Sequence, residues 1–368
     1  MHDASVRLGQ AHVSVPARGP VARARWLFYP DYRGSVPYQD LLARSLEPWA
    51  ASGAGTVTDA LEAAATGPVV FHLHQEDAVT AGLAGDAARE AVGLFLAELD
   101  AFRACGGRLV WTMHNAAPHE DREPELSRAL RAALAVRADL LHVHGAIAAR
   151  LARALGAPEQ RIVIVPHPDL APGYPDDVTD AAARRYFRLG PEHRVFAFMG
   201  AMRAYKGLDV LARAFDQLAP ARPEARLIMA GRQAGWVEAR YLAPSPQLLL
   251  VPRHVEDATV QYVLRAADFV VLPYRRILSS GSAALALGFG RPLIVPDLPP
   301  LLEVVRPGRE AIVYRAGDAD ELTAALERAC AMPPDERQAM RDAALAGGRS
   351  VNFDDLAAAL RVAADFPA

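Results

Sequence analysis

Short apolar runs alternate along the chain with alanine-rich stretches whose apolar residues recur at helical spacing. The apolar runs of the first half are ARWLFYP (24–30), PVVFHLH (68–74), GRLVWTMHN (107–115), ADLLHVHG (138–145) and RIVIVPHP (161–168). After the connection HPDLAPGYPDDVTD (167–180), the pattern starts again with RVFAFMGA, ARLIMAGR, QLLLVPR, DFVVLP, PLIVPD and EAIVYRA. This alternation predicts parallel strands joined by crossover helices, in two successive sets.

The break between the two sets predicts a two-domain α/β protein. Pro and Asp cluster between about residues 170 and 190 without hydrophobic periodicity, and 368 residues exceed what one core normally serves. We predict Rossmann-like, doubly wound domains at 1–180 and 181–350, and a last amphipathic helix within 351–368, capped by Asn352, that returns toward the N-terminal domain. Two such sheets place the carboxyl ends of their strands at a shared cleft, where ligands bind.

Composition removes several classes of function. The formal charge of -3, from 40 basic and 43 acidic residues, creates no net field that would gather nucleic acid or hold the chain on an anionic membrane. Cys105 and Cys330 form no CxxC arrangement, so we expect two small buried hydrophobes instead of a disulfide framework or a zinc site. No window reaches the ~18–20 apolar residues of a membrane span, and the start of the chain lacks a signal-peptide core, so we expect a soluble cytoplasmic protein.

Two turns that follow predicted strands carry the features of an anion site. In GAMRAYKG, the strand ends at Gly200, and Arg203 and Lys206 precede Gly207 and an amphipathic helix. In SSGS (279–282), three hydroxyls and a glycine open an apolar helix. Cations, free backbone NH groups and the helix dipole all favour negative oxygen, so the pair of turns suits a diphosphate. Solvated surface cations and a plain N-cap without ligand are the alternatives.

These residues resemble a known family. The segments FMGAMRAYKGLDVLARAF, GR, ADFVVLPY, SSGSAALALGFGRPLIVPD and LLEVVRPGREAIVYRAGDADELTAAL look like the nucleotide-sugar-binding half of a GT-B glycosyltransferase of the family-4 group and its bacterial polysaccharide relatives. The resemblance implies a GT-B fold with a nucleoside diphosphate sugar as co-substrate and no other cofactor. It implies a donor site that includes Gly200, Arg203, Lys206, Gly207, Arg232, His254, Ser279, Ser280, Gly281, Ser282 and Glu303.

The departure from the family pattern concerns stereochemistry. Retaining family-4 enzymes carry two glutamates across the second turn and its helix, where this chain has Ile277 and Leu285. We therefore expect an inverting enzyme, which needs a general base from the N-terminal domain. No carboxylate pair is placed to chelate a metal against the diphosphate, because Asp318 and Asp320 suit the N-cap of a late helix, so we expect no metal site.

Candidates for the base follow predicted strands of the N-terminal half. Glu76 and Asp77 come first and Glu120 second, and His114 is a candidate ligand to the sugar or diphosphate. A solvated carboxylate or a satisfied core histidine is the alternative for each. The pairs His72/His74 and His142/His144 lack a clear third ligand for zinc. The turn formed by Arg33, Gly34 and Ser35 is placed to line the acceptor side, or is a simple turn.

We therefore predict transfer of a sugar from a UDP- or GDP-sugar to an acceptor hydroxyl, independent of metal and with inversion. A retaining family-4-like transferase and a GT-B-shaped binding subunit without catalysis remain alternatives. A dehydrogenase is excluded because no GxGxxG follows the first strand. The acceptor is a glycan, a lipid-linked or a small molecule and not a nucleic acid. Arg18, Arg23 and Arg25 before Trp26 suggest peripheral membrane contact, or a solvated terminus.

Overall fold

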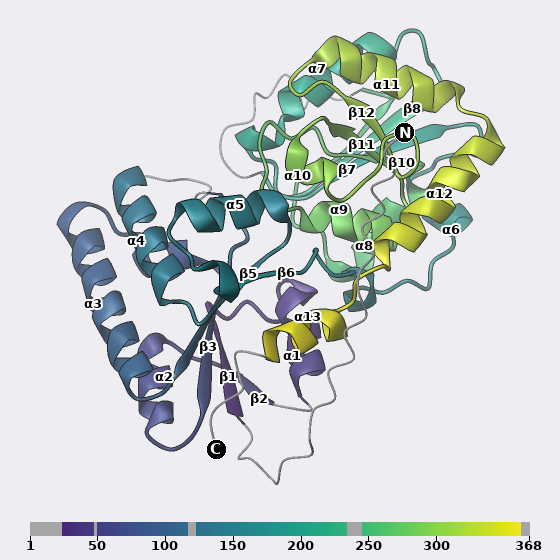
Figure 1. Cartoon of the computed structure of the whole chain (residues 1–368). Coiled ribbons are helices and arrows are strands. Elements are labelled where there is room, and N and C mark those ends of the chain that lie inside the picture. Colours follow the sequence, from purple (N-terminus) through teal and green to yellow (C-terminus); the bar gives the residue numbers. More distant parts are fainter. Residues whose placement is uncertain (1–23, 48–49, 117–122, 234–244, 362–368) are drawn as a thin grey trace, which may run out of the picture.

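A computed structural model of the protein describes residues 24–47, 50–116, 123–233 and 245–361. These residues form two parallel sheets. Within these residues each sheet has six strands, in the orders β2-β1-β3-β4-β5-β6 and β12-β11-β10-β7-β8-β9 (Figure 1). All strand pairs in both sheets are parallel. The predicted α/β fold of two doubly wound sheets is therefore confirmed.

The N-terminal sheet is built from the apolar runs of the first half of the chain. Its strands are β1 (Ala24–Tyr29), β2 (Ala50–Ala54), β3 (Val69–Leu73), β4 (Arg108–Thr112), β5 (Leu140–Val143) and β6 (Ile162–Ile164). The helical segments are α1 (Pro37–Leu46), α2 (Val57–Ala64), η1 (Glu76–Thr80), α3 (Gly85–Ala104), α4 (Pro124–Arg137), α5 (Ala146–Ala154), η2 (Glu159–Arg161) and η3 (Ala171–Gly173).

Alternate strand residues of this sheet pack into two different cores, as the two-residue period of a strand requires. Trp26 and Phe28 of β1 belong to the core that contains α1, whereas Phe71 and Leu73 of β3 belong to the core under α3 and α4. Both faces are covered by helices, and all five residues of β3 are buried. Such burial on both faces explains why the strands read as continuous apolar runs in the sequence.

The C-terminal sheet repeats the arrangement. Its strands are β7 (Arg194–Met199), β8 (Ala225–Ala230), β9 (Leu248–Val251), β10 (Phe269–Val271), β11 (Leu293–Pro296) and β12 (Ala311–Tyr314). The helical segments are α6 (Asp180–Tyr186), η4 (Ala204–Lys206), α7 (Leu208–Leu218), α8 (Asp257–Ala266), α9 (Gly281–Gly288), α10 (Pro299–Leu302), α11 (Ala319–Ala331), α12 (Pro334–Gly348) and α13 (Phe353–Leu360). No helix among the described residues is long and apolar enough to cross a membrane.

Two helices show why the donor-side turns lie where they do. Helix α7 buries Leu208, Leu211 and Phe215 at helical spacing, which fixes its start directly after the turn at Gly207. Helix α9 is buried from Ala283 onward, while its first residues, Gly281 and Ser282, are only half-buried. The apolar body therefore anchors each helix at the carboxyl edge of the sheet, where Gly207 and Leu208 at the start of α7 are buried and the first residues of α9 are half-buried.

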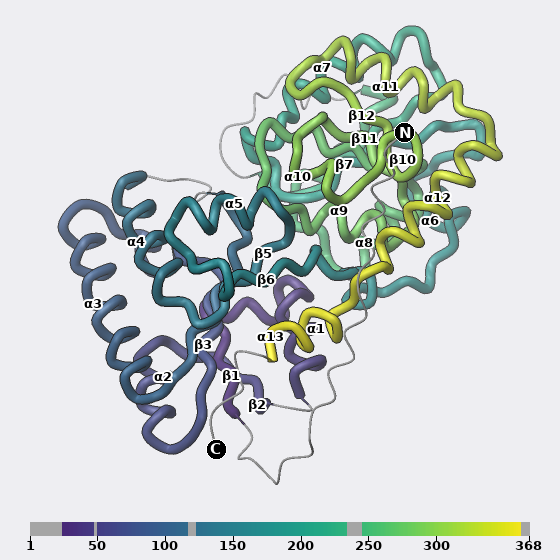
Figure 2. Tube along the Cα trace, viewed as in Figure 1, coloured from purple at the N-terminus to yellow at the C-terminus, as the bar shows by residue number. Residues whose placement is uncertain are grey.

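Helix α13, the yellow segment in Figure 2, lies beside α1 of the N-terminal domain. Helix α13 packs against α1, with the rings of Phe353 and Tyr38 at 5.2 Å, and the amide of Asp169 donates to the carbonyl of Val351 at 2.9 Å. Asn352 caps α13 with a capping box, because its side chain accepts from the amide of Asp355. The exact domain limits of 180 and 350 stay a prediction.

Candidate functional site

The two predicted anion-binding turns lie side by side at the carboxyl edge of the C-terminal sheet. The first turn links β7 to α7 through η4, and the second links β10 to α9. The amide of Arg275 donates to the carbonyl of Tyr205 at 2.8 Å, and its guanidinium pairs with Asp209 of α7. The two helix N-termini therefore lie close together, an arrangement that suits a ligand with more than one phosphate.

Lys206 and Ser282 converge on Gly200 from these two turns. A β-carbon placed at Gly200 would lie 3.2 Å from Nζ of Lys206 and 3.7 Å from Oγ of Ser282. Gly200 has no β-carbon, so this space stays available beside an ammonium and a hydroxyl. Both groups can donate hydrogen bonds to an anion held there.

The cations of the first turn carry no compensating carboxylate. Arg203 and Lys206 are half-buried, and neither forms an ion pair with any of the described residues. The ammonium of Lys206 instead lies 5.1 Å from the centre of the Tyr274 ring and 5.9 Å from those of Phe198 and Tyr205. Aromatic faces attract a cation without neutralising it, so the positive charge remains available to a ligand.

Composition singles out the same residue. Lys206 is the only lysine among the 40 basic residues of the chain, and all others are arginine. A compact ammonium and a planar guanidinium bind anions differently, so the two are not interchangeable at a site that needs a point charge. The presence of a single lysine among 40 basic residues is visible in the sequence and gives a further reason to single out Lys206.

The four residues of the second turn have separate local roles. Ser280 caps α9, because its Oγ accepts from the amide of Ala283 at 3.1 Å. Ser279 reaches the other domain, where its Oγ donates to the carbonyl of His114 at 2.9 Å. Gly281 and Ser282, at the start of the first helical turn, are half-buried. One serine thus satisfies the helix and another links the domains, which leaves Ser282 for the cleft.

Gly207 offers a test of how tightly the two turns are joined. Its φ is 66°, and a β-carbon there would lie 2.0 Å from the carbonyl oxygen of Pro273. We expect Gly207→Ala to separate the turns and to lower stability by clearly more than the ~1–2 kcal/mol that left-handed backbone costs an ordinary residue. The matched control is Gly308→Ala, where φ is 76° but no atom lies within 4 Å of the new β-carbon. Thermal unfolding of both variants measures the difference, and equal losses would contradict the steric contact.

The remaining predicted donor residues occupy two different environments. Arg232 follows β8 and His254 follows β9, and both side chains are exposed at the carboxyl edge. Glu303 instead lies against the N-terminal domain, where its carboxylate accepts from the amide of Ile147 at 2.9 Å, in the first turn of α5. Its carboxylate thus complements the positive end of that helix. A role of Glu303 in donor binding stays a prediction.

The histidines of the N-terminal domain form two hydrogen-bonded chains beneath the cleft. The indole of Trp26 donates to Nδ1 of His72 at 3.0 Å, and Nε2 of His72 lies 2.8 Å from the hydroxyl of Thr112. That hydroxyl lies 3.1 Å from Nδ1 of His142, whose Nε2 lies 3.1 Å from the carbonyl of Val165. Because an indole only donates and a carbonyl only accepts, every member of this chain is neutral and its direction is fixed.

A second chain ends on the same carbonyl. Nδ1 of His144 lies 3.3 Å from the oxygen of Val165, and Nε2 of His144 lies 3.4 Å from Nδ1 of His114. Nε2 of His114 in turn lies 3.1 Å from Nδ1 of His74. The carbonyl requires His144 to donate, so His114 donates to His144 and accepts from His74. Both ring nitrogens of His114 are therefore occupied, and a substrate would have to displace a neighbouring histidine to use either of them.

Burial keeps these histidines neutral. It lowers the pKa of His142 to about 4 and places the pKa values of His72, His74, His114 and His144 well below their usual range, an effect reinforced by repulsion among the rings. No group of three or more His, Cys, Asp or Glu side chains in the described part of the chain is arranged to hold a metal ion. Most ring nitrogens of these histidines bond to another ring, to Thr112 or to the carbonyl of Val165, whereas Nε2 of His74 has no hydrogen-bond partner among the described residues.

The neutral histidines predict sensitivity to acid. Histidines in the unfolded chain have a pKa near 6.5, and those in the folded protein have lower pKa values. Below about pH 6.5 the unfolded state therefore binds more protons than the folded state, and the free energy of unfolding decreases as the pH falls. Each histidine that stays neutral in the folded protein lowers the free energy of unfolding by about 1.4 kcal/mol when the pH falls from 7.5 to 5.5. Urea titrations at both values measure this loss. His142→Asn should reduce it and His254→Gln, at an exposed position, should not; a stability independent of pH would contradict the assignment.

The first candidate base has a partner inside the domain. Glu76 is 6% exposed, and its carboxylate lies 3.0 Å from Nε of Arg131 in α4, which is 4% exposed. The same guanidinium donates to the carbonyls of Asn115 and Ala116, the residues that follow His114. Burial raises the pKa of Glu76, and Arg131 opposes that rise. Glu76 thus anchors the loop beside the cleft and does not reach its surface.

The other candidates differ in accessibility. Asp77 is exposed at the start of η1, whereas Glu120 lies outside the described residues. On the acceptor side, Arg33 pairs with Asp31 at 2.9 Å and the amide of Gly34 donates to Asp40 at 2.8 Å. The hydroxyl of Ser35 donates to a carbonyl within the same loop. These contacts define a closed turn between β1 and α1, and an acceptor role for it stays a prediction.

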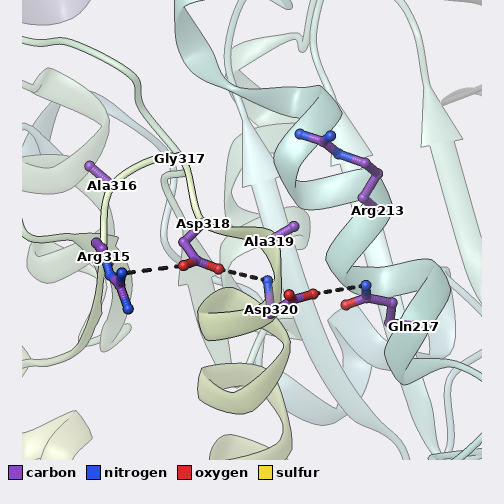
Figure 3. Close-up of a pocket in the computed structure, with 8 residues that line it drawn as sticks. All are labelled: Arg213, Gln217, Arg315, Ala316, Gly317, Asp318, Ala319 and Asp320. Atoms are coloured by element: carbon purple, nitrogen blue, oxygen red, sulfur yellow. Dashed lines mark hydrogen bonds and ion pairs between the residues drawn. The ribbon is translucent and has the colours of Figure 1, made fainter.

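A pocket of about 520 Å³ lies elsewhere, between α7 and the start of α11 (Figure 3). Asp318 caps α11 there by accepting from two of its amides, as predicted, and Gln217 donates to Asp320 at 3.0 Å. No residue predicted to bind the donor lines it. Several of its polar groups bond to one another, as the dashed lines in Figure 3 show.

Comparison with known proteins connects these turns to a family. Residues 193–331, which contain both turns, match the family described as glycosyl transferases group 1. A D-inositol 3-phosphate glycosyltransferase of Nocardia farcinica is 31% identical over 239 residues, which cover 59% of this chain and 52% of the relative. A GDP-mannose:glycolipid 4-beta-D-mannosyltransferase of Xanthomonas campestris is 24% identical over 276 residues, 72% of either chain. The chain thus spans about half the length of the Nocardia relative.

Solved structures share the whole two-domain arrangement. Anabaena HepE in complex with UDP superposes with a TM-score of 0.72 at 13% identity, covering 92% of this chain and 99% of that one. Sucrose-phosphate synthase from Thermosynechococcus elongatus superposes with a TM-score of 0.60 at 16% identity, covering 91% and 96%. From the sheets and these superpositions, we conclude that the chain has the GT-B fold, and its residues 193–331, which contain both turns, match the glycosyl transferases group 1 family.

Proposed function

We propose that this protein transfers a sugar from a nucleoside diphosphate sugar, a UDP- or GDP-sugar, to an acceptor hydroxyl. One observation carries the proposal: an unneutralised ammonium and a serine hydroxyl, from two adjacent helix N-termini, converge on the bare backbone of Gly200. UDP in the HepE structure and GDP-mannose in the name of the Xanthomonas relative supply the two nucleotides. The acceptor in this proposal is a glycan, a lipid-linked molecule or a small molecule.

The chemistry that we propose is a direct displacement. The acceptor oxygen forms a bond to the anomeric carbon, the bond from that carbon to the phosphate oxygen breaks, and the hydroxyl proton passes to a base. The departing diphosphate gains negative charge, which Arg203, Lys206 and the two helix N-termini are placed to stabilise. In this proposal these cations take the part that a metal ion plays in other transferases, and the configuration at the anomeric carbon inverts.

The base has to come from the N-terminal side of the cleft. Among the candidates within the described residues, exposed Asp77 is accessible to an acceptor, whereas Glu76 is buried against Arg131. We therefore propose Asp77 as the first carboxylate to test. A retaining, family-4-like transferase is the second candidate, because residues 193–331 match the glycosyl transferases group 1 family; it would use backbone amides of the two turns where Ile277 and Leu285 replace the two glutamates.

The single lysine permits a direct test of the donor site. Apart from the N-terminus, Lys206 supplies the only amine of the chain, so an amine-selective label followed by peptide mass spectrometry reports on it alone. We expect UDP or GDP to protect Lys206 from labelling in the presence of EDTA, and uridine to give no protection. Hydrolysis of the donor to free sugar and nucleotide separates an enzyme from a binding subunit. Equal labelling with and without every nucleoside diphosphate would overturn the proposal.

A further inference from the structure

His167 lies where the two domains meet, on the segment that follows β6. Its ring stacks on His144, with centres 4.7 Å apart and planes at 22°, and its edge meets Tyr38 at 5.4 Å. Nδ1 of His167 lies 3.2 Å from the carbonyl oxygen of Pro168. Since a carbonyl only accepts, Nδ1 carries the proton of the neutral ring, and Nε2 presents a lone pair.

That lone pair faces the second donor turn. A β-carbon placed at Gly281 would lie 3.3 Å from Nε2 of His167, so the imidazole touches the first residue of α9. Ser282, the next residue, faces Gly200 and Lys206 on the other side of the turn. The turn is therefore enclosed by a lysine from its own domain and by a histidine from the interdomain segment.

The state of His167 in the free protein conflicts with a phosphate at this place. Burial lowers the pKa of His167 to about 4, so the free ring is neutral near pH 7. A lone pair repels a phosphate oxygen, whereas a protonated Nε2 would donate a charge-assisted hydrogen bond to it. The titratable groups that face the ring are His144, directly after β5, and Tyr38 of α1, and His114 and His142 also repel a charge on it. Burial keeps all four uncharged, and α9 contributes only Gly281. Asp169, the carboxylate two residues after His167, accepts a hydrogen bond from the amide of Ala171.

We propose that His167 is a further donor-contacting residue, which takes up a proton from solvent when the sugar nucleotide binds and donates it in a hydrogen bond to a phosphate oxygen at the start of α9. The inference rests on the proposed function, because it requires a diphosphate between the two turns. The bound negative charge favours the imidazolium, so binding and protonation reinforce each other. Affinity for the donor therefore rises as the pH falls toward 6.

Calorimetry measures the proton directly. UDP-glucose and GDP-mannose are suitable probes because their diphosphates have no group that titrates near neutral pH. Titrating either at pH 7 in two buffers of different ionisation enthalpy should show net proton uptake by the wild-type protein. His167→Gln should bind roughly ten- to a hundredfold more weakly, as loss of a charged hydrogen bond implies, without uptake. His193→Gln, at a histidine that precedes β7 at the end of the strand opposite to Gly200, is the control and should retain both.

A second measurement needs no variant. In ¹⁵N spectra of histidine-labelled wild-type protein, the Nε2 signal of one of the 11 histidines should move from the unprotonated to the protonated region when donor is added. Donor binding without proton uptake and without such a shift would overturn the role of His167 and leave the proposed function intact. If neither sugar nucleotide nor any nucleoside diphosphate binds, the proposed function fails, and the role of His167 fails with it.

Discussion

Replacing Lys206 by alanine is expected to remove most donor binding and transfer while leaving the fold intact. The ammonium is half-buried among three aromatic rings and has no ion pair within the described residues, so its charge contributes to the fold only through its contacts with these rings. Loss of a group that stabilises a developing negative charge costs roughly 10²–10³-fold in kcat. Loss of a charged hydrogen bond to the diphosphate weakens UDP or GDP binding by roughly ten- to a hundredfold.

Two variants sharpen the test of Lys206. Lys206→Arg keeps the charge but places it on a larger group. It should recover only part of the affinity for UDP or GDP, because a planar guanidinium does not occupy the space of an ammonium. Arg328→Ala, at a position that is 58% exposed on α11, removes a cation remote from the turns and should change neither binding nor stability. Unchanged nucleotide affinity in a folded Lys206→Ala protein would refute the donor site.

The second large effect concerns stability and comes from the ion pair between Glu76 and Arg131. Removing one partner of a buried pair leaves an uncompensated charge, which costs roughly 3–5 kcal/mol. We therefore expect Arg131→Met to lower the free energy of unfolding by that amount and to release the backbone of Asn115 and Ala116, which the guanidinium holds. Denaturant unfolding measures the first effect, and protease sensitivity of the loop after His114 measures the second.

Helix α4 also provides the matched control. Arg137 pairs with Asp100 at 2.8 Å, but its side chain is 27% exposed and that of Asp100 is 51% exposed. Arg137→Met should cost less than about 1 kcal/mol, as exposed pairs do. In Arg131→Met, Glu76 can escape its isolation by protonation, so the difference from wild type should shrink as the pH falls from 7.5 to 5.5. Equal stability losses for the two arginines would show that the pair with Glu76 is not buried in solution.

Three side chains of the C-terminal domain, those of Leu278, Ser279 and Glu303, contact the N-terminal domain. Leu278, from the loop before α9, is buried in the core of the N-terminal domain, and its neighbour Ser279 donates to His114. Glu303 holds the start of α5 from the opposite side. Ser279 thus contacts the loop after β4, and Glu303 contacts the start of α5.

The sequence by itself determined the elements and the location of the donor turns. Alternating apolar runs predict parallel strands, and capping residues mark helix starts at Asp318 and Asn352, because these signals act between residues a few positions apart. The turns before α7 and α9 could be found for the same reason, since a strand, a glycine and an amphipathic helix are all local features. The cations of the first turn follow directly from that placement.

Only the tertiary structure decided which polar groups remain free for chemistry. Glu76 looked like a base after a strand, but Arg131 from another helix neutralises it. His114 looked like a ligand, but His74 and His144 occupy both of its nitrogens. His167 looked like part of a linker, yet it faces Gly281 in the other domain. Each outcome depends on burial and on partners distant in sequence, and no local pattern encodes which of several carboxylates or histidines will find such a partner.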